Sequence, residues 1–150
     1  MAGSVENRLK EMGIELPVAA APAANYVPFH VSGGQLFVSG QLPIIAGGPD
    51  FKGKVGADVD LDTAQNAARS CAINILAQAK AALGDLDRIA QCLKLGAFVN
   101  STPDFTDHPE VVNRRDRSCL CEIRHEKRPS VARVQKNREP NWKGPPAARS

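Results

Sequence analysis

The sequence predicts an α+β domain in which helices pack on one face of a mainly antiparallel sheet. Three observations support this class: two strand-like segments joined by a glycine turn, one long alanine-rich helix, and a later segment in which apolar residues alternate. With 150 residues, the chain is long enough for one domain with a single core and too short for two of ordinary size.

The first predicted element is a short helix over residues 4–12, with Ser4 as its N-cap and Gly13 as its stop. A connector rich in proline and alanine follows over 16–24 and is expected to be extended.

The next elements are predicted strands over 26–31 and 35–40, joined by a tight turn at Gly33 and Gly34. The second strand belongs to the run Leu36-Phe37-Val38-Ser39-Gly40-Gln41-Leu42-Pro43, in which an apolar stretch stops in a small polar turn. Such a strand end brings backbone N–H groups and a hydroxyl to the surface, and glycine lets a ligand approach the backbone. This end is therefore a candidate site, with a plain strand end as the alternative.

The longest helix is predicted over 63–83, with Asp62 as N-cap, Gln65 completing a capping box and Gly84 as the stop. Its inward face is predicted from the residues that recur at helical spacing: Ala64, Ala68, Cys71, Ile75, Ala79 and Ala82. Because most of these side chains are small, the helix can lie close to a sheet.

Two further elements precede the C-terminal segment. Residues 89–100 are predicted to be a strand whose inward face carries Leu93, Leu95, Ala97 and Val99. Pro109 is placed to open another helix.

Composition excludes several classes. No apolar run is long enough to span a bilayer, and the N-terminus lacks the basic-then-apolar order of a secretory signal, so a cytosolic protein is expected. The four cysteines form no disulfide framework, and Cys71 and Cys92 are interpreted as small apolar core residues. Cys119, Cys121 and His125 lack a fourth zinc ligand at suitable spacing, so no metal site is predicted.

The charge changes sign near Asn113. Residues 1–113 hold 8 basic and 12 acidic side chains, and residues 114–150 hold 11 basic and 4 acidic ones. The tail also loses the apolar periodicity that precedes it. Its basic residues with Trp142 could contact RNA phosphates, but the aromatic residues are few, and a disordered basic stretch is the favoured interpretation. His30 and His108 are isolated in the sequence, and no catalytic Ser/His/Asp set can be assembled.

Residues 3–113 carry several motifs in the order found in one family. These motifs are Asn25-Tyr26-Val27-Pro28, the run 36–43, Gly53-Lys54-Val55-Gly56, the helix through Asn74, Gly84-Asp85-Leu86 and Gly96-Ala97-Phe98-Val99-Asn100. In these motifs the chain resembles the RidA/YjgF family, and in particular its longer bacterial branch, which begins with a short helix and Gly-Ile-Glu-Leu-Pro.

The resemblance implies a chorismate-mutase-like fold that assembles as a homotrimer with sites between subunits. It also implies hydrolysis of reactive enamines and imines of the 2-aminoacrylate type to 2-oxo acids and ammonia, without a cofactor. The expected partners are therefore a second and third copy of the chain and a small imine, enamine or 2-oxo acid, with neither RNA nor a membrane expected. A non-catalytic small-molecule or RNA-binding trimer, in line with the endoribonuclease label used in the family, stays the alternative.

By motif, the resemblance assigns substrate binding to Tyr26, Ser39, Gly40 and Asn113. Tyr26 would line the cleft, Ser39 and Gly40 would present hydroxyl and backbone donors, and Asn113 would sit at the helix of the cleft. Imine hydrolysis needs a bound carboxylate, a positioned water and stabilised charge more than a strong nucleophile. Each residue also has a plain alternative: packing for Tyr26, satisfying its own strand end for Ser39 and helix capping for Asn113.

The family pattern breaks after Asn113, where the family continues with Gly-Ala and later an arginine that clamps the substrate carboxylate. This sequence instead continues as an atypical basic tail over 114–150, and Arg128 is only a faint match to that arginine. The codons of residues 113–118 can be written so that deleting one base yields Asn-Gly-Ala-Ile-Asp-Leu. The tail is therefore interpreted as another reading frame of the same gene, and 1–113 as a truncated family domain whose last strands are not recognisable.

Overall fold

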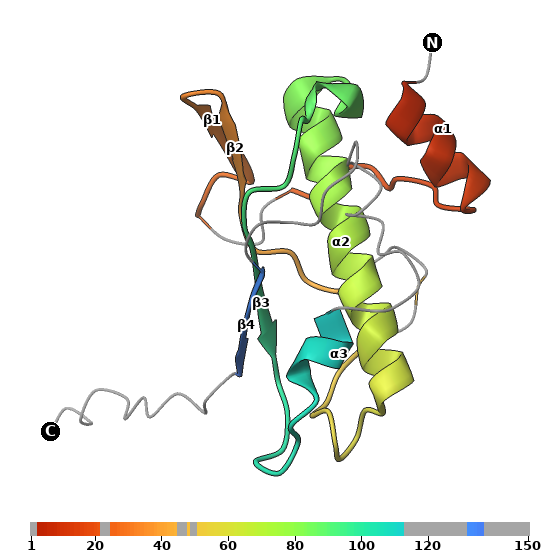
Figure 1. Ribbon diagram of the computed structural model, residues 1–150, viewed down its shortest axis with the longest axis vertical. Helices are drawn as coiled ribbons and strands as arrows, with labels where there is room; N and C mark the ends of the chain where they lie inside the picture. Colours follow the sequence, from red (N-terminus) through yellow and green to blue (C-terminus); the bar gives the residue numbers. More distant parts are fainter. Residues whose placement is uncertain (1–2, 22–24, 45–47, 49–50, 113–131, 137–150) are drawn as a thin grey trace, which may run out of the picture.

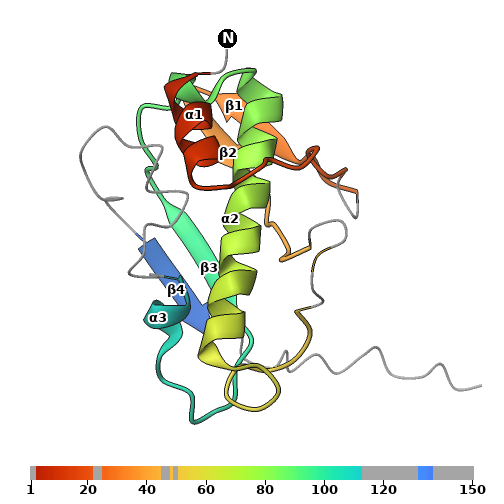
Figure 2. The ribbon, with the colours of Figure 1, turned by 90° about the vertical axis from the view of Figure 1, so that its right-hand side faces the viewer.

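The structure is a computed structural model that describes residues 3–21, 25–44, 48, 51–112 and 132–136. Its elements, in order, are α1 (Ser4–Glu11), β1 (Phe29–Ser32), β2 (Gln35–Val38), α2 (Leu61–Leu83), the 3-10 turn η1 (Leu86–Arg88), β3 (Leu95–Val99), α3 (His108–Val112) and β4 (Ala132–Lys136). Figures 1 and 2 show α1, α2 and α3 on the same side of the strands. The predicted α+β class with helices on one face is confirmed.

The strands β1 and β2 form the predicted antiparallel hairpin, with Phe29 paired to Val38 and Ser32 paired to Gln35. Gly33 and Gly34 both have positive φ, at 55° and 73°, as a two-residue turn of this kind requires. The first strand was predicted to begin at residue 26 but begins only after Pro28, because a proline has no N–H to give to the strand ladder.

The strand β3 is shorter than the predicted 89–100, and Leu93, which was predicted to face inward, lies before it and is exposed. Within β3 the alternation is as predicted, since Val99 is buried, Leu95 and Ala97 are partly buried, and Gly96 and Phe98 are exposed. It pairs in parallel with β4, from Leu95 with Ala132 to Val99 with Lys136. This strand lies in the segment where the sequence showed no recognisable one. The rest of 114–150 lies outside the described residues.

The helix α2 begins two residues before the predicted start. Its N-cap is Asp60, whose side chain accepts a hydrogen bond from Thr63 N at 2.7 Å, so the assignment of Asp62 was wrong. The predicted capping box is absent, because Gln65 Nε2 donates to Glu110 O of α3 at 2.9 Å. The predicted stop at Gly84 is confirmed by its left-handed conformation, with φ at 77°.

The helix α1 is capped by a residue far away in the sequence. Its N-cap position is Gly3, and the Asp87 carboxylate of η1 accepts hydrogen bonds from Ser4 N at 2.6 Å and from Val5 N at 2.8 Å. A Cβ on Gly3 would lie 2.7 Å from Asp87 Oδ2, so any larger residue here would push the capping carboxylate out of its present place. The prediction of Ser4 as N-cap was therefore wrong.

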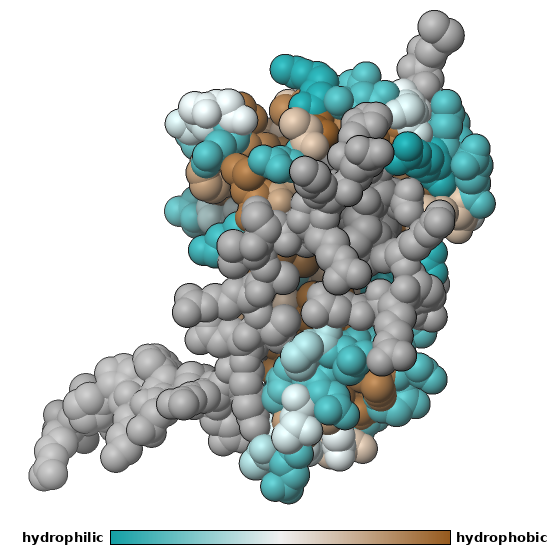
Figure 3. All heavy atoms as spheres, in the orientation of Figure 1, coloured by the Kyte–Doolittle hydropathy of each residue, from teal (hydrophilic) through white to brown (hydrophobic). Residues whose placement is uncertain are grey.

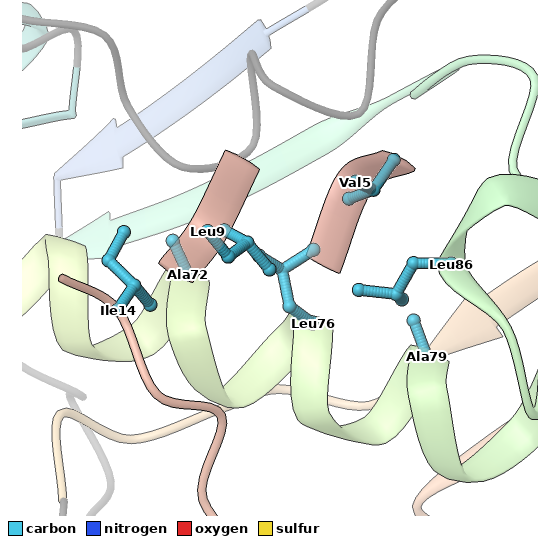
Figure 4. Close-up of a cluster of buried hydrophobic side chains, with 7 residues drawn as sticks. All are labelled: Val5, Leu9, Ile14, Ala72, Leu76, Ala79 and Leu86. Atoms are coloured by element: carbon cyan, nitrogen blue, oxygen red, sulfur yellow. The ribbon is translucent and has the colours of Figure 1, made fainter. Parts of the chain in front are cut away.

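The core forms two clusters. Figure 4 shows the larger one, in which side chains of α1 and of the segment after it meet α2 and η1: Val5, Leu9, Ile14, Ala72, Leu76, Ala79 and Leu86. The smaller cluster joins β3, α3 and the start of α2 through Val55, Ala64, Val99 and Val111. Among the described helices, none is both long enough and apolar enough to cross a membrane.

The buried arc of α2 differs from the one predicted by spacing. Ala64 and Ala79 are buried as expected, whereas Cys71 and Ile75 are only partly buried, and Ala72 and Leu76 take the inner positions. The difference arises because α1 also packs against α2. The helix α2 therefore buries residues toward two neighbours, the strands and α1, instead of toward the strands alone.

Candidate functional site

The candidate site lies where β2 ends. Ser39 N donates to Pro28 O at 3.0 Å, and Ser39 Oγ donates to Val27 O at 2.5 Å, so that both groups bind the chain ahead of β1. Gln41 Nε2 in turn donates to Ser39 O at 3.1 Å. These bonds hold the strand end in a fixed shape. They also leave the Ser39 hydroxyl, whose proton is engaged, as an acceptor toward any ligand.

Gly40 follows directly and is open to solvent. A Cβ built at this position meets no atom of the described residues within 4 Å, and its φ lies outside the positive range that favours glycine. Neither packing nor backbone conformation therefore explains the glycine here. The open space above its backbone is room that a small ligand could occupy.

Tyr26 lies in the chain ahead of β1, on the segment that Ser39 binds, and is 45% exposed. It is thus a partly exposed aromatic residue and not a fully buried core residue. Tyr26, Ser39 and Gly40 come from two neighbouring stretches that the bonds to Val27 and Pro28 join.

The fourth candidate, Asn113, lies outside the described residues, as do Arg128 and the three potential zinc ligands Cys119, Cys121 and His125. Within the described part of the chain, no group of three or more His, Cys, Asp or Glu side chains could hold a metal ion.

Sequence reasoning missed the hydrogen bond between Ser101 Oγ and His108 Nε2, at 2.9 Å. It treated His108 as isolated, but the ring also packs edge-on against Phe105, with 5.2 Å between ring centroids. Ser101 is buried, and its link to His108 joins the end of β3 to the start of α3. Because the two residues are seven positions apart across a loop, no helical or strand spacing could have signalled the pair.

A hollow of about 570 Å³ lies elsewhere, between α1, the segment that follows it and α2. Leu9, Ile14 and Ala77 line it together with Lys80, which forms an ion pair with Glu6. None of Tyr26, Ser39 and Gly40 contributes to its lining.

Comparison with known proteins gives a consistent result. A sequence model of the family described as "YjgF/chorismate mutase-like, putative endoribonuclease" matches residues 6–135, past the point where the motifs stop. A protein named TCP17 from Trypanosoma cruzi is 49% identical over 112 residues, which are 75% of this chain and 70% of that protein.

Two solved structures are also similar. A protein of unknown function from Agrobacterium tumefaciens has 47% identity and a TM-score of 0.73, with 87% of this chain and 79% of that chain covered. A protein from Shewanella oneidensis described as a "putative endoribonuclease" has 31% identity and a TM-score of 0.79, with 90% and 89% covered. With the matching fold, these relatives show that the chain belongs to the YjgF/chorismate-mutase-like family.

Proposed function

We propose that this protein hydrolyses small reactive enamines and imines of the 2-aminoacrylate type to 2-oxo acids and ammonia, at the end of β2. The observation that carries the proposal is the open backbone at Gly40, next to Ser39, whose bonds fix it to the segment that follows the exposed Tyr26. A fixed backbone with free space beside it can orient a small anionic substrate without a cofactor.

The chemistry suits a site without a strong nucleophile. The enamine tautomerises to the imine, a water adds to the carbon of the C=N bond, and a proton moves to nitrogen. The C–N bond then breaks, so that ammonia leaves and the ketone of the 2-oxo acid forms. The protein has to bind the carboxylate, place the water and stabilise the charge that develops.

We further propose that three copies of the chain complete the site. Phe37 of β2 and Phe98 of β3 are 56% and 71% exposed, and in Figure 3 apolar atoms reach the surface over the β1–β2 hairpin. Exposed apolar side chains of this size favour burial against a partner. We place the reaction in the cytosol, where the free thiols of Cys71 and Cys92 would stay reduced.

The direct test generates 2-aminoacrylate with a pyridoxal-phosphate lyase and follows ammonia and 2-oxo acid with and without this protein. We expect the protein to raise the hydrolysis rate in proportion to its concentration, and Tyr26→Ala to reduce that gain. Val18→Ala is the matched control, because Val18 is almost fully exposed and lies away from the strand end. Ligand binding without turnover would support the non-catalytic alternative.

A parallel incubation with single-stranded RNA tests the activity that the family description names. If the protein cleaves the RNA and Tyr26→Ala leaves that cleavage unchanged, ribonuclease activity would replace our proposal. Of the two histidines that the structure describes, His108 contacts Ser101 and Phe105, whereas His30 of β1 is exposed.

The interpretation of the C-terminal segment is tested by sequencing the gene and weighing its product. We propose that 114–150 is an out-of-frame continuation, so the 3′ end should be resequenced and the intact mass measured on protein made from the natural gene. A mass that matches the shifted frame, with trimeric elution, would direct the assay to that protein. Codons incompatible with the shift would refute this interpretation.

A further inference from the structure

A single side chain of α2 holds the chain that leaves the candidate site. Asn74 Nδ2 donates to Leu42 O at 3.0 Å and to Ile44 O at 2.8 Å. Both N–H groups of one amide are thus used on carbonyls two residues apart. The side chains of Leu42 and Ile44 are 61% and 68% exposed, so burial of those side chains does not fix this segment. Its backbone position depends on the amide.

The segment is fixed at its other end by Ser39, through the bonds to Pro28 O and Val27 O. Gly40 and Gln41 therefore lie between two anchors, one on the chain ahead of β1 and one on α2. Neither residue belongs to a helix or strand. Without the second anchor, the backbone after Gly40 would be free to take other conformations.

We infer that Asn74 is a positioning residue, which sets the direction of the Gly40 backbone by holding Leu42 O and Ile44 O. The inference deepens the proposed function and rests on it for the identity of the ligand. The tethering role itself rests on the two hydrogen bonds alone. A loss of Asn74 should therefore loosen the site before it unfolds the domain.

The same helix supplies a matched control. Gln78, one turn after Asn74, donates from Nε2 to Ala20 O at 2.7 Å and is more deeply buried. It tethers the connector that follows α1, which contributes none of Tyr26, Ser39 or Gly40. Asn74→Leu and Gln78→Leu thus each remove an amide tether between α2 and a loop, and only the first tether holds the residues directly after Gly40.

The experiment compares both variants with the unaltered full chain by ¹⁵N relaxation, thermal unfolding and hydrolysis of generated 2-aminoacrylate. Asn74→Leu should lower the order parameters of the backbone N–H groups of Gly40, Gln41 and Leu42 from about 0.85 to below about 0.6. It should also lower kcat/KM by about tenfold, since small misplacements of a site reduce rate strongly. Gln78→Leu should leave both values unchanged and lower the unfolding midpoint at least as far as Asn74→Leu does.

The outcomes separate the two proposals. If the unaltered protein does not accelerate hydrolysis, the proposed function fails, and the order parameters still decide the role of Asn74. Unchanged order parameters at Gly40, Gln41 and Leu42 in Asn74→Leu would overturn the inference. So would an equal loss of kcat/KM in Gln78→Leu, because both losses would then reflect stability alone.

Discussion

Replacing Leu76 by alanine tests the packing of α1 on α2. Leu76 is 0% exposed and lies among Val5, Leu9 and Ile14 from the N-terminal segment. The change removes three carbons, about 2.4 kcal/mol at about 0.8 kcal/mol per buried methylene. The cavity left behind raises the loss of unfolding free energy to about 3–4 kcal/mol. For a domain of this length the midpoint of thermal unfolding should fall by roughly 6 to 16 °C.

Ile75→Ala is the matched control, because spacing in the sequence places Ile75 on the inner face while the structure leaves it only partly buried. We expect it to cost about 1 kcal/mol. Urea unfolding followed by far-UV circular dichroism gives both values, provided that the denaturant slopes agree. A loss for Ile75→Ala equal to or above that for Leu76→Ala would put Ile75 inside and refute the packing described here.

Three further predictions test the caps and the buried thiol. Asp87→Ala removes the acceptor of Ser4 N and Val5 N, so the unfolding free energy should fall by about 1–2 kcal/mol and amide hydrogen exchange within α1 should rise. Unchanged amide exchange in α1 would contradict the role of Asp87 as its cap. Hydrogen bonds from Thr63 lower the pKa of Asp60 below its ordinary 3.8, so the cap stabilises the fold above that range and is lost as the pH falls through it. The midpoint should therefore fall more steeply below about pH 4 for the unaltered protein than for Asp60→Asn, whose amide oxygen caps at every pH, and parallel curves would argue against it. Burial raises the pKa of Cys71 to about 11, so iodoacetamide near pH 8 should modify it more slowly than Cys92, as peptide mass spectrometry would show; equal rates would contradict its burial.

The features predicted well from the sequence depend on local chemistry. The hairpin was predicted because Gly33 and Gly34 supply the positive φ angles that its turn needs, and Gly84 ends α2 for the same reason. The features predicted poorly depend on distant partners. Asp87 caps α1 across more than eighty residues, and α1 in turn moves the buried arc of α2 from Ile75 to Leu76. Spacing along one helix cannot show a second helix that packs on it.

The residues of the candidate site were likewise predicted only in part. The sequence singled out Ser39 and Gly40 because a polar turn ends an apolar strand, and the structure places them at an exposed strand end. It gave no reason to connect Asn74 with that turn, because the two are more than thirty residues apart and an asparagine within a helix has many uses. Only the path of the chain brings the amide to the carbonyls of Leu42 and Ile44.

The bonds of Ser39 limit what the site can do by itself. Its hydroxyl proton goes to Val27 O, so the site residues that the structure describes leave the backbone N–H groups around Gly40 and the hydroxyl of Tyr26 as donors for a substrate carboxylate. Backbone donors are neutral and bind an anion less strongly than a guanidinium does. The exposed Phe37 and Phe98 lie on strands whose outer face the helices leave uncovered. A second copy on that face would bury both rings and could add a cationic group beside Gly40, so assembly and substrate binding should be lost together in Phe37→Asp.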